Sequence, residues 1–257
     1  MSFAQEAPIV RLGDGIAGLC ALAGAATLVL TDLPSGETVA TFDREPDLGR
    51  LWPAVWQALC PTGIAVMMAS SLRFAAKLVA SQPATFRYDL VWKKNHATGF
   101  LNAKMRPLRA HEFVLVFWRS GPVAYASQMS EGHLPMTGNC RDGTGPNTPH
   151  GDNYGIADRG KRGRARVGAT DRYPISVLDI PGVANNSSTR VHPQQKPDAL
   201  MRWLVRSYSR PGDLVLDPFA GSGSAGRAAL AEGRRFAGWD IDPRFGTFEV
   251  EEEEALA

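Results

Sequence analysis

The stretch VLDPFAGSGSAG, residues 215–226, combines an apolar strand, a glycine-rich turn and the beginning of a helix. Gly221, Gly223 and Gly226 have the G-x-G-x-x-G spacing, in which small residues let the backbone approach a ligand closely. The helix N-terminus that follows favours anionic groups. Asp240 closes the next predicted strand, about twenty residues on, where a carboxylate can accept hydrogen bonds from ribose hydroxyls. The stretch therefore predicts a nucleotide-like ligand on a Rossmann-like turn.

The position of this stretch near the end of the chain indicates how the sheet is completed. Only 17 residues follow Asp240, too few for the further strands of a nicotinamide-binding domain. A nicotinamide oxidoreductase is therefore the least favoured interpretation, and Pro218 and Phe219 before the glycines also argue against it. The missing strands must come from the N-terminal half, so that the first two strands of the sheet come last in the sequence.

Strand-like and helix-like segments alternate through the rest of the chain. The predicted strands are 8–12, 26–31, 64–69, 86–92, 113–118, 213–217 and 235–240, and the predicted helices are 16–24, 47–59, 71–81, 197–208 and 223–232. This alternation predicts an α/β fold with a Rossmann-like, doubly wound, mainly parallel and circularly permuted sheet that carries a loop-rich insert.

Composition places few further limits on function. The chain has 257 residues and a net charge of +2, which by itself does not indicate a nucleic-acid partner. Its three cysteines are odd in number and widely spaced, which favours a reducing compartment, and we expect a cytoplasmic protein. No apolar run approaches the ~20 residues of a membrane span, and no membrane contact is expected.

The middle of the chain has a different character. Residues 137–155 are rich in Gly, Asn, Pro and Asp without periodicity, and residues 158–172 hold six basic and two acidic residues. A solvated loop and a binding surface both fit this charge run. A zinc site from His133, Cys140 and His150 is disfavoured because their spacing matches no usual ligand pattern, so no metal is expected.

Asp14, residues 31–36, residues 217–223 and Asp240 all follow predicted strands, and carboxyl ends of strands share one edge of an open α/β sheet. These segments resemble a known family. The matching segments are DPFAGSG at 217–223, HPQQKP at 192–197, GD at 13–14, LVLTDLPSG at 28–36, VWKK at 91–94 and RAHEFVLVFWR at 109–119. They resemble the beta-class, permuted S-adenosylmethionine-dependent DNA amino-methyltransferases, which modify adenine N6 or cytosine N4.

The resemblance implies an organisation and a cofactor site. Residues 1–118 would form the catalytic half of the sheet, 119–173 a loop-rich, basic target-recognition insert, 174–243 the cofactor-binding half of the same domain, and 244–257 an acidic tail. S-adenosylmethionine would be wrapped by Phe219, Gly221 and Gly223 with Asp217 close by. Asp240 would hold the ribose, Asp14 the adenine amino group, and Gln195 and Lys196 the methionine carboxylate. For Asp14 a helix cap, and for Lys196 a surface lysine, are the alternatives.

Asp32, Leu33, Pro34 and Ser35 stand where the resemblance places the family's DPPY catalytic motif. The Asp32 carboxylate and a backbone carbonyl at Leu33 or Pro34 would accept hydrogen bonds from an exocyclic amine and so release its lone pair for attack. The target base must leave the duplex to be reached. Ser35 replaces the aromatic residue that stacks on the flipped base, a contact worth roughly 1–3 kcal/mol. Candidate replacement rings are Trp92, Phe100, Phe42 and Tyr154, and Trp92 is expected rather in the core.

The resulting hypothesis is a site-specific DNA methyltransferase, with adenine N6 favoured because the motif begins with Asp. Cytosine N4 methylation, a catalytically silent DNA-binding relative and a methyltransferase of RNA or another amine are the alternatives. DNA is the expected partner, a homodimer is compatible with the sequence, and no restriction endonuclease partner is identified. The basic residues expected to contact DNA are Arg159, Lys161, Arg162, Arg164 and Arg166.

Overall fold

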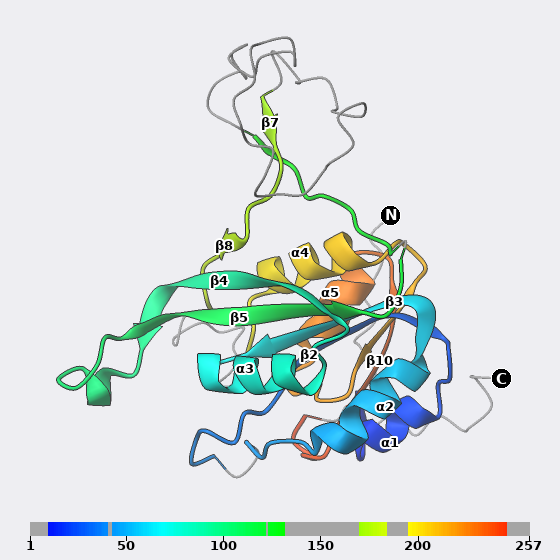
Figure 1. Ribbon diagram of the computed structural model, residues 1–257, viewed down its shortest axis with the longest axis horizontal. Coiled ribbons are helices and arrows are strands. Elements are labelled where there is room, and N and C mark those ends of the chain that lie inside the picture. Colours follow the sequence, from blue (N-terminus) through cyan, green and yellow to red (C-terminus); the bar gives the residue numbers. More distant parts are fainter. Residues whose placement is uncertain (1–9, 41–42, 122, 132–169, 184–194, 246–257) are drawn as a thin grey trace. The chain divides into compact units, whose positions relative to one another are not determined.

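The computed structural model describes residues 10–40, 43–121, 123–131, 170–183 and 195–245 (Figure 1). The chain divides into a larger unit, 1–126 with 175–257, and a smaller unit, Ser127–Pro174. Among the described residues of the smaller unit, strands β6 (Ser130–Glu131) and β7 (Asp171–Arg172) form an antiparallel pair. Within the described ranges, every helix is too short or too polar to span a membrane.

The larger unit is built on one eight-stranded sheet (Figure 1). Its strands, in spatial order, are β1 (Val10–Leu12), β10 (Arg235–Asp240), β9 (Leu214–Asp217), β2 (Ala26–Asp32), β3 (Leu59–Ala69), β5 (Arg109–Trp118), β4 (Phe86–Thr98) and β8 (Val177–Asp179). The first five are parallel neighbours, β5 runs antiparallel to β3 and β4, and β8 is parallel to β4. The predicted permuted, mainly parallel sheet is confirmed.

The permutation is visible in the pairing at the centre of the sheet. β9 pairs with β2 at Leu28 opposite Val215 and at Val29 opposite Leu216, so the two halves of the chain meet there. The path along the sheet reverses at this junction, because β2 leads on to β3 and β9 leads on to β10. Such a reversal point opens a crevice beyond the carboxyl ends of the strands.

Helices cover both faces of the sheet, as a doubly wound fold requires. On one face lie α1 (Gly15–Cys20), α2 (Leu48–Ala58) and α3 (Leu72–Ser81), and on the other α4 (Asp198–Tyr208) and α5 (Ser224–Ala231). The side chains of Asp14, Asp47 and Ser71 cap the first three helices by accepting hydrogen bonds from backbone N–H groups of the first turn.

The central strand β2 is apolar on both sides, which explains its place in the sheet. Leu28 and Leu30 point into the core under α4 and α5, whereas Val29 points into the core under α1 to α3. All three side chains are fully buried. Parallel strands covered on both faces carry continuous apolar runs of this kind rather than an alternating pattern.

Strands β4 and β5 are longer than the sequence predicts. Their outer parts continue as an antiparallel hairpin, and the short 3-10 helix η1 (Phe100–Asn102) lies at its tip. We refer to residues 93–109 as the β4–β5 arm, which extends from the sheet at the left of Figure 1. The residues of the arm do not alternate between apolar and polar side chains, so the sequence carries no periodic pattern that would predict these strand ends.

The contact between α1 and the glycine-rich loop provides a test of the permuted junction. A Cβ added to Gly15 would lie 1.9 Å from the carbonyl oxygen of Pro218. We expect Gly15→Ala to lower the free energy of unfolding by about 1–3 kcal/mol in urea titrations, because the backbone must shift to admit the methyl group.

Helix propensity acts in the opposite direction, since alanine is the better helix former. A stabilised Gly15→Ala variant would therefore contradict the contact. Gly121→Ala is the matched control, because the nearest atom to its added Cβ is 3.9 Å away, and its effect should be small.

Candidate active site

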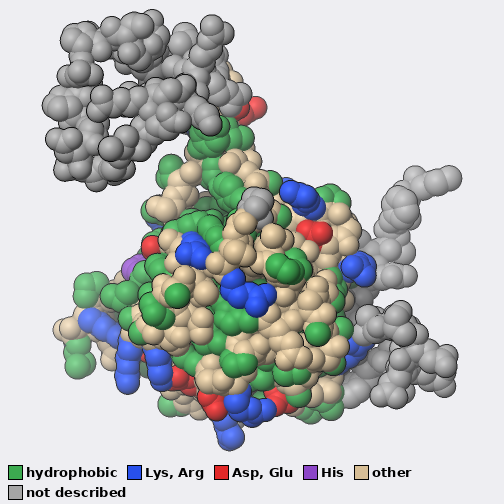
Figure 2. All heavy atoms as spheres, turned by 45° about the vertical axis from the view of Figure 1, so that its right-hand side comes forward, with side chains coloured by type: hydrophobic (Ala, Val, Ile, Leu, Met, Phe, Trp, Pro, Cys, Tyr) green, Lys and Arg blue, Asp and Glu red, His purple; other side chains and the backbone are tan. Residues whose placement is uncertain are grey.

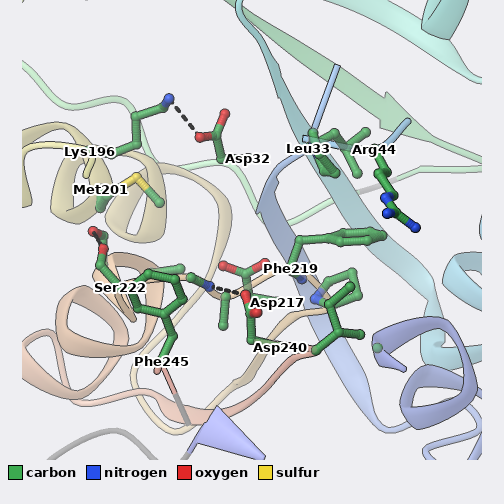
Figure 3. Close-up of a pocket in the computed structure, with 18 of the residues that line it drawn as sticks. Asp32, Leu33, Arg44, Lys196, Met201, Asp217, Phe219, Ser222, Asp240 and Phe245 are labelled. Carbon is green, nitrogen blue, oxygen red and sulfur yellow. Dashed lines mark hydrogen bonds and ion pairs between the residues drawn. The ribbon is translucent and has the colours of Figure 1, made fainter. Parts of the chain in front are cut away.

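Four aspartates meet at the carboxyl ends of four adjacent strands. Asp14 follows β1, Asp240 ends β10, Asp217 ends β9 and Asp32 ends β2. All four line one cavity, which has a volume of about 150 Å³ (Figure 3). The convergence predicted from the sequence is therefore present, and it gives this cavity a strongly acidic lining.

Two of these carboxylates hold the backbone around the cavity. Asp240 accepts hydrogen bonds from the N–H groups of Gly221 (2.8 Å) and Asp242 (2.8 Å). Asp14 accepts from the N–H of Ile16 at 2.9 Å and pairs with Arg50 at 3.3 Å. Asp14 thus caps α1 and also stands in the cavity wall, so the helix cap is present, and a contact with the adenine amino group stays a prediction.

Asp217 is the most deeply buried of the four. Its side chain accepts a hydrogen bond from the N–H of Phe219 at 3.1 Å. Burial raises its pKa to about 7, and the neighbouring charges of Asp32 and Asp240 act in the same direction. The cavity consequently holds a carboxyl group that changes charge near neutral pH.

The glycine-rich loop supplies one wall of the cavity. Gly221 has a φ of 50° and Gly223 a φ of 73°, the left-handed conformation that glycine adopts without strain. Phe219, Gly221, Ser222 and Ser224 line the cavity, and the Phe219 ring lies across its middle in Figure 3. Gly223 acts as the N-cap of α5.

An ionic cluster lies beside Asp32. The ammonium of Lys196 is 2.7 Å from Oδ2 of Asp32 and 3.1 Å from Oε2 of Glu112, and Lys94 is 2.9 Å from Oε1 of Glu112. The side chains of Lys196, Glu112 and Lys94 are 9%, 11% and 12% exposed. Two carboxylates thus face two ammonium groups, and the formal charges cancel.

The cluster sets the ionisation of its members. Burial raises the pKa of Asp32, against the attraction of Lys196. Burial alone would raise the pKa of Glu112, but Lys196 and Lys94 outweigh it and lower that pKa. For Lys196, burial acts to lower the pKa and the two carboxylates raise it above its usual value. Lys196 is therefore a permanent cation within hydrogen-bond reach of Asp32.

The ring of Trp92 supports both lysines. Its centroid lies 5.9 Å from the ammonium of Lys196 and 5.7 Å from that of Lys94, the range of cation–π contacts. The indole N–H donates to the carbonyl of Ile180 at 2.8 Å, and the side chain is buried. Trp92 belongs to the core, as expected from the sequence.

The loop after Asp32 is held in place by the core and by the carboxylate of Asp43. Leu33 is buried in the core against α1 to α3, and Pro34 lines the cavity. Asp43 accepts from the N–H groups of Gly36 (2.9 Å) and Thr38 (2.8 Å). Burial works against these hydrogen bonds, but they prevail and lower the pKa of Asp43. The loop is thereby held by a carboxylate that stays ionised.

A second, polar cavity lies on the other side of the cluster. It has a volume of about 650 Å³. Its lining comes from the loop after β2, the start of α3 and the arm. Glu112, Lys94 and Ser35 belong to this lining, whereas Asp32 and Lys196 line the first cavity. The ion pairs from Asp32 to Glu112 therefore connect the two cavities.

The predicted site residues divide into four groups. Those that line the first cavity are Asp14, Asp32, Leu33, Pro34, Lys196, Asp217, Phe219, Gly221 and Asp240. Ser35 lines the second, while Gln195 and Gly223 are described but are absent from the lining of both. Outside the described residues lie Arg159, Lys161, Arg162, Arg164 and Arg166, the rings of Phe42 and Tyr154, and His133, Cys140 and His150. The described residues contain no group of three acidic, histidine or cysteine side chains suited to a metal ion.

Sequence reasoning missed Glu112 and Arg44. Glu112 is the acidic residue at the start of the apolar run of β5, and a charge facing a core is the signal that identifies it. Arg44 lines the first cavity from an irregular segment that carries no pattern. Its guanidinium lies near the Phe219 ring in Figure 3.

Comparisons with known proteins agree on the kind of protein. The family model for DNA methylase (N6_N4_Mtase) matches residues 49–248. The DNA adenine methyltransferase YhdJ of Escherichia coli (strain K12) is 50% identical over 75 residues. That alignment covers 29% of this chain and 26% of YhdJ, so the chain spans about a quarter of this curated relative.

Solved structures share the fold along nearly the whole chain. The complex of M1.HpyAVI with SAM has a TM-score of 0.58 at 19% identity and covers 92% of this chain and 94% of that chain. The cytosine-N4-specific PvuII DNA methyltransferase has a TM-score of 0.61 at 16% identity, with 95% and 87% covered. At these identities the likeness concerns the fold.

The ionic cluster leads to a prediction about stability. We expect Lys196→Met to lower the free energy of unfolding at pH 8 by on the order of 3 kcal/mol, because it leaves two carboxylates without their shared cation. Without Lys196 the pKa of Asp32 rises further in the folded protein. A carboxyl group whose pKa is raised on folding lowers the free energy of unfolding as the pH increases. The deficit should therefore shrink toward pH 5 in urea unfolding.

Lys93→Met is the matched control, because Lys93 makes a 2.6 Å ion pair with Asp179 in which both side chains are more than half exposed. Its effect should stay within about 1 kcal/mol. A deficit of Lys196→Met that is equal at both pH values would indicate poorer packing rather than uncompensated charge.

Proposed function

Because this chain belongs to the DNA methylase family, we propose that it transfers a methyl group from S-adenosylmethionine to the exocyclic amine of a DNA base, most readily adenine N6. The observation that carries the proposal is Asp32 itself. It stands at the end of β2, in the wall of a cavity suited to the cofactor, and is linked through Lys196 to the polar cavity beyond.

The first cavity has the chemistry that this cofactor needs. S-adenosylmethionine presents a positive sulfonium, an ammonium, ribose hydroxyls and an adenine amino group, all of which seek acceptors or negative charge. Asp14, Asp217 and Asp240 offer acceptors in the lining, and Phe219 offers an aromatic face. In this assignment Asp240 takes the ribose hydroxyls and Asp14 the adenine amino group.

The methionine carboxylate has a different best partner from the one the motif suggests. Lys196 is engaged by Asp32 and Glu112. Ser222 and Ser224 line the cavity at the N-terminus of α5, where hydroxyls and backbone N–H groups favour an anion. We therefore assign the carboxylate to this helix end, and Lys196 to Asp32.

Asp32 prepares the amine for attack. The amine nitrogen is a weak nucleophile because its lone pair is delocalised into the base. When bound, the cofactor supplies an electrophilic methyl group. Lys196 fixes Oδ2 of Asp32, so that Oδ1 can accept a hydrogen bond from the amine. A carbonyl of Leu33 or Pro34 takes the second amine proton, in a loop held by Asp43. Such fixed acceptors act without reorganisation in the transition state.

Proton balance also favours Asp32. Transfer of the methyl group to nitrogen would return the carbon–sulfur electron pair to sulfur, and the amine would then have one proton to release. The Asp32 carboxylate is the acceptor in place, and burial raises its pKa. Lys196 is fully protonated and cannot take the proton. The residue that orients the amine therefore also receives its proton.

Adenine is favoured over cytosine by two observations. The motif begins with Asp32, and the 75-residue alignment that is 50% identical is to an adenine methyltransferase.

Contact with DNA is assigned to basic residues within residues 119–173, whose charge can meet phosphates and guanine edges. These residues are Arg159, Lys161, Arg162, Arg164 and Arg166.

A catalytically silent DNA-binding relative is the second candidate, and Ser35 is the observation that favours it. Its Oγ accepts from the N–H of Glu37 and from the Ser70 hydroxyl, both at 3.4 Å. A serine side chain has no ring to stack on a flipped base, and the hydroxyl of Ser35 is used within the loop. This candidate predicts binding of cofactor and DNA without turnover.

Nucleoside mass spectrometry separates the two candidates. DNA from cells that express this chain should contain N6-methyladenine, and DNA from cells that express Asp32→Ala should not, because the acceptor of the amine protons is gone. Methylation that survives Asp32→Ala would refute the mechanism. Absence of any modified base with a folded, cofactor-binding protein would support the silent candidate or a substrate other than DNA.

Asp217 should make cofactor binding depend on pH. Since its pKa is about 7 and a cationic ligand favours the ionised carboxylate, we expect the affinity for S-adenosylmethionine to rise on the order of tenfold from pH 6 to pH 8. For Asp217→Asn, the affinity should change with pH only as far as the ionisable groups of S-adenosylmethionine itself titrate. Identical calorimetric pH profiles for the two proteins would show that Asp217 does not face the bound cation.

A further inference from the structure

The β4–β5 arm carries positive charge and no negative charge. Residues 93–109 include Lys93, Lys94, Lys104, Arg106 and Arg109, together with His96, and no Asp or Glu. Partners elsewhere neutralise the inner part, where Lys93 pairs with Asp179 and Lys94 with Glu112. Lys104 and Arg106 lie exposed toward the tip. The net charge of the arm is thus concentrated at its outer end.

The same tip exposes apolar side chains. Phe100 is 81% exposed, Leu101 98%, Met105 86% and Leu108 41%. Apolar and basic side chains stand next to one another on the projection at the lower left of Figure 2. Four large apolar side chains gathered on one projecting hairpin indicate a surface that is covered in the working protein.

The root of the arm is fixed to the catalytic loop's surroundings. Arg109 donates to the carbonyl of Ser70, at the end of β3. Thr98, Arg106 and Arg109 line the polar cavity together with Ser35 and Gly36. A polymer that delivers a base to this cavity would therefore contact the root of the arm, which supplies part of the lining.

We propose that the β4–β5 arm is a duplex-binding element, in which Lys104 and Arg106 contact phosphates and Phe100 and Leu101 press against the bases of the groove. Cations that meet phosphates beside apolar side chains that wedge between base steps are a known combination in proteins that deform DNA. A second copy of this chain fits less well, because two arms without acidic residues would repel one another.

The proposal rests on the proposed function, since it names how the substrate of that site is held. Binding to a short random-sequence duplex is measured by fluorescence anisotropy between about 50 and 200 mM salt. For Lys104→Gln with Arg106→Gln, we expect the slope of log affinity against log salt to become shallower by about two, because each substitution removes the cation that neutralises one phosphate.

A matched control removes the same charge elsewhere. Arg210 and Arg235 are exposed at the amino ends of β9 and β10, away from the cavities at the carboxyl ends. Arg210→Gln with Arg235→Gln should leave the slope unchanged. For Phe100→Ser with Leu101→Ser, affinity should fall on the order of tenfold at an unchanged slope, because the interaction removed is not ionic. Wild-type affinity for S-adenosylmethionine in every variant checks the fold.

The outcomes separate the arm from the function. If wild-type protein methylates DNA in an Asp32-dependent manner and both arm variants bind DNA like wild type, the arm proposal is overturned and the function stands. If the apolar variant only converts a dimer to a monomer in sedimentation, the tip binds a second copy and the proposal is likewise overturned. If wild-type protein neither binds nor methylates DNA, the proposed function fails together with the arm.

Discussion

A single ammonium group between two carboxylates joins the parts of this protein. Lys196 precedes α4, Asp32 ends β2 and Glu112 stands in β5, so the ion pairs tie three segments distant in sequence. Each charge is costly to bury alone, and the cluster is tolerable only because all its members are present and close. Its formation therefore requires β2, β5 and the segment before α4 to be in place, and its geometry in turn fixes the orientation of the Asp32 carboxylate.

The cluster also separates two kinds of chemistry. On the side of β9 and β10 the lining is acidic and suits a cationic cofactor, and on the side of the arm the lining is polar with basic residues from β4 and β5. Asp32 faces the first region and is coupled electrically to the second through Lys196. Under the proposed function the methyl donor would occupy the first region and the amine would reach Asp32 from the second, which would place the amine and the sulfur on opposite sides of the methyl carbon, as an in-line displacement needs.

Much of this arrangement could be predicted from the sequence, and the failures have physical causes. The glycine turn and the strand-end aspartates could be recognised as parts of a Rossmann-like site, because each is local in the sequence. Glu112 could be recognised as a charge in an apolar strand, but its partners could not be named, since they meet it only after β5 pairs antiparallel to β3. Lys196 stood in a recognisable motif, yet its partner depends on how far Asp32 is buried. The ends of β4 and β5 carry no apolar alternation, so periodicity could not reveal the arm.

The permuted order of strands has a consequence for how the protein is made. β2 is translated long before its neighbour β9, so Leu28 can pair with Val215 only after most of the sheet has been made. During that interval an apolar strand has an unpaired edge, a hazard for aggregation and a burden for chaperones. A prematurely terminated product would contain Asp32 but lack the glycine-rich loop after β9, so the cavity between them would be incomplete.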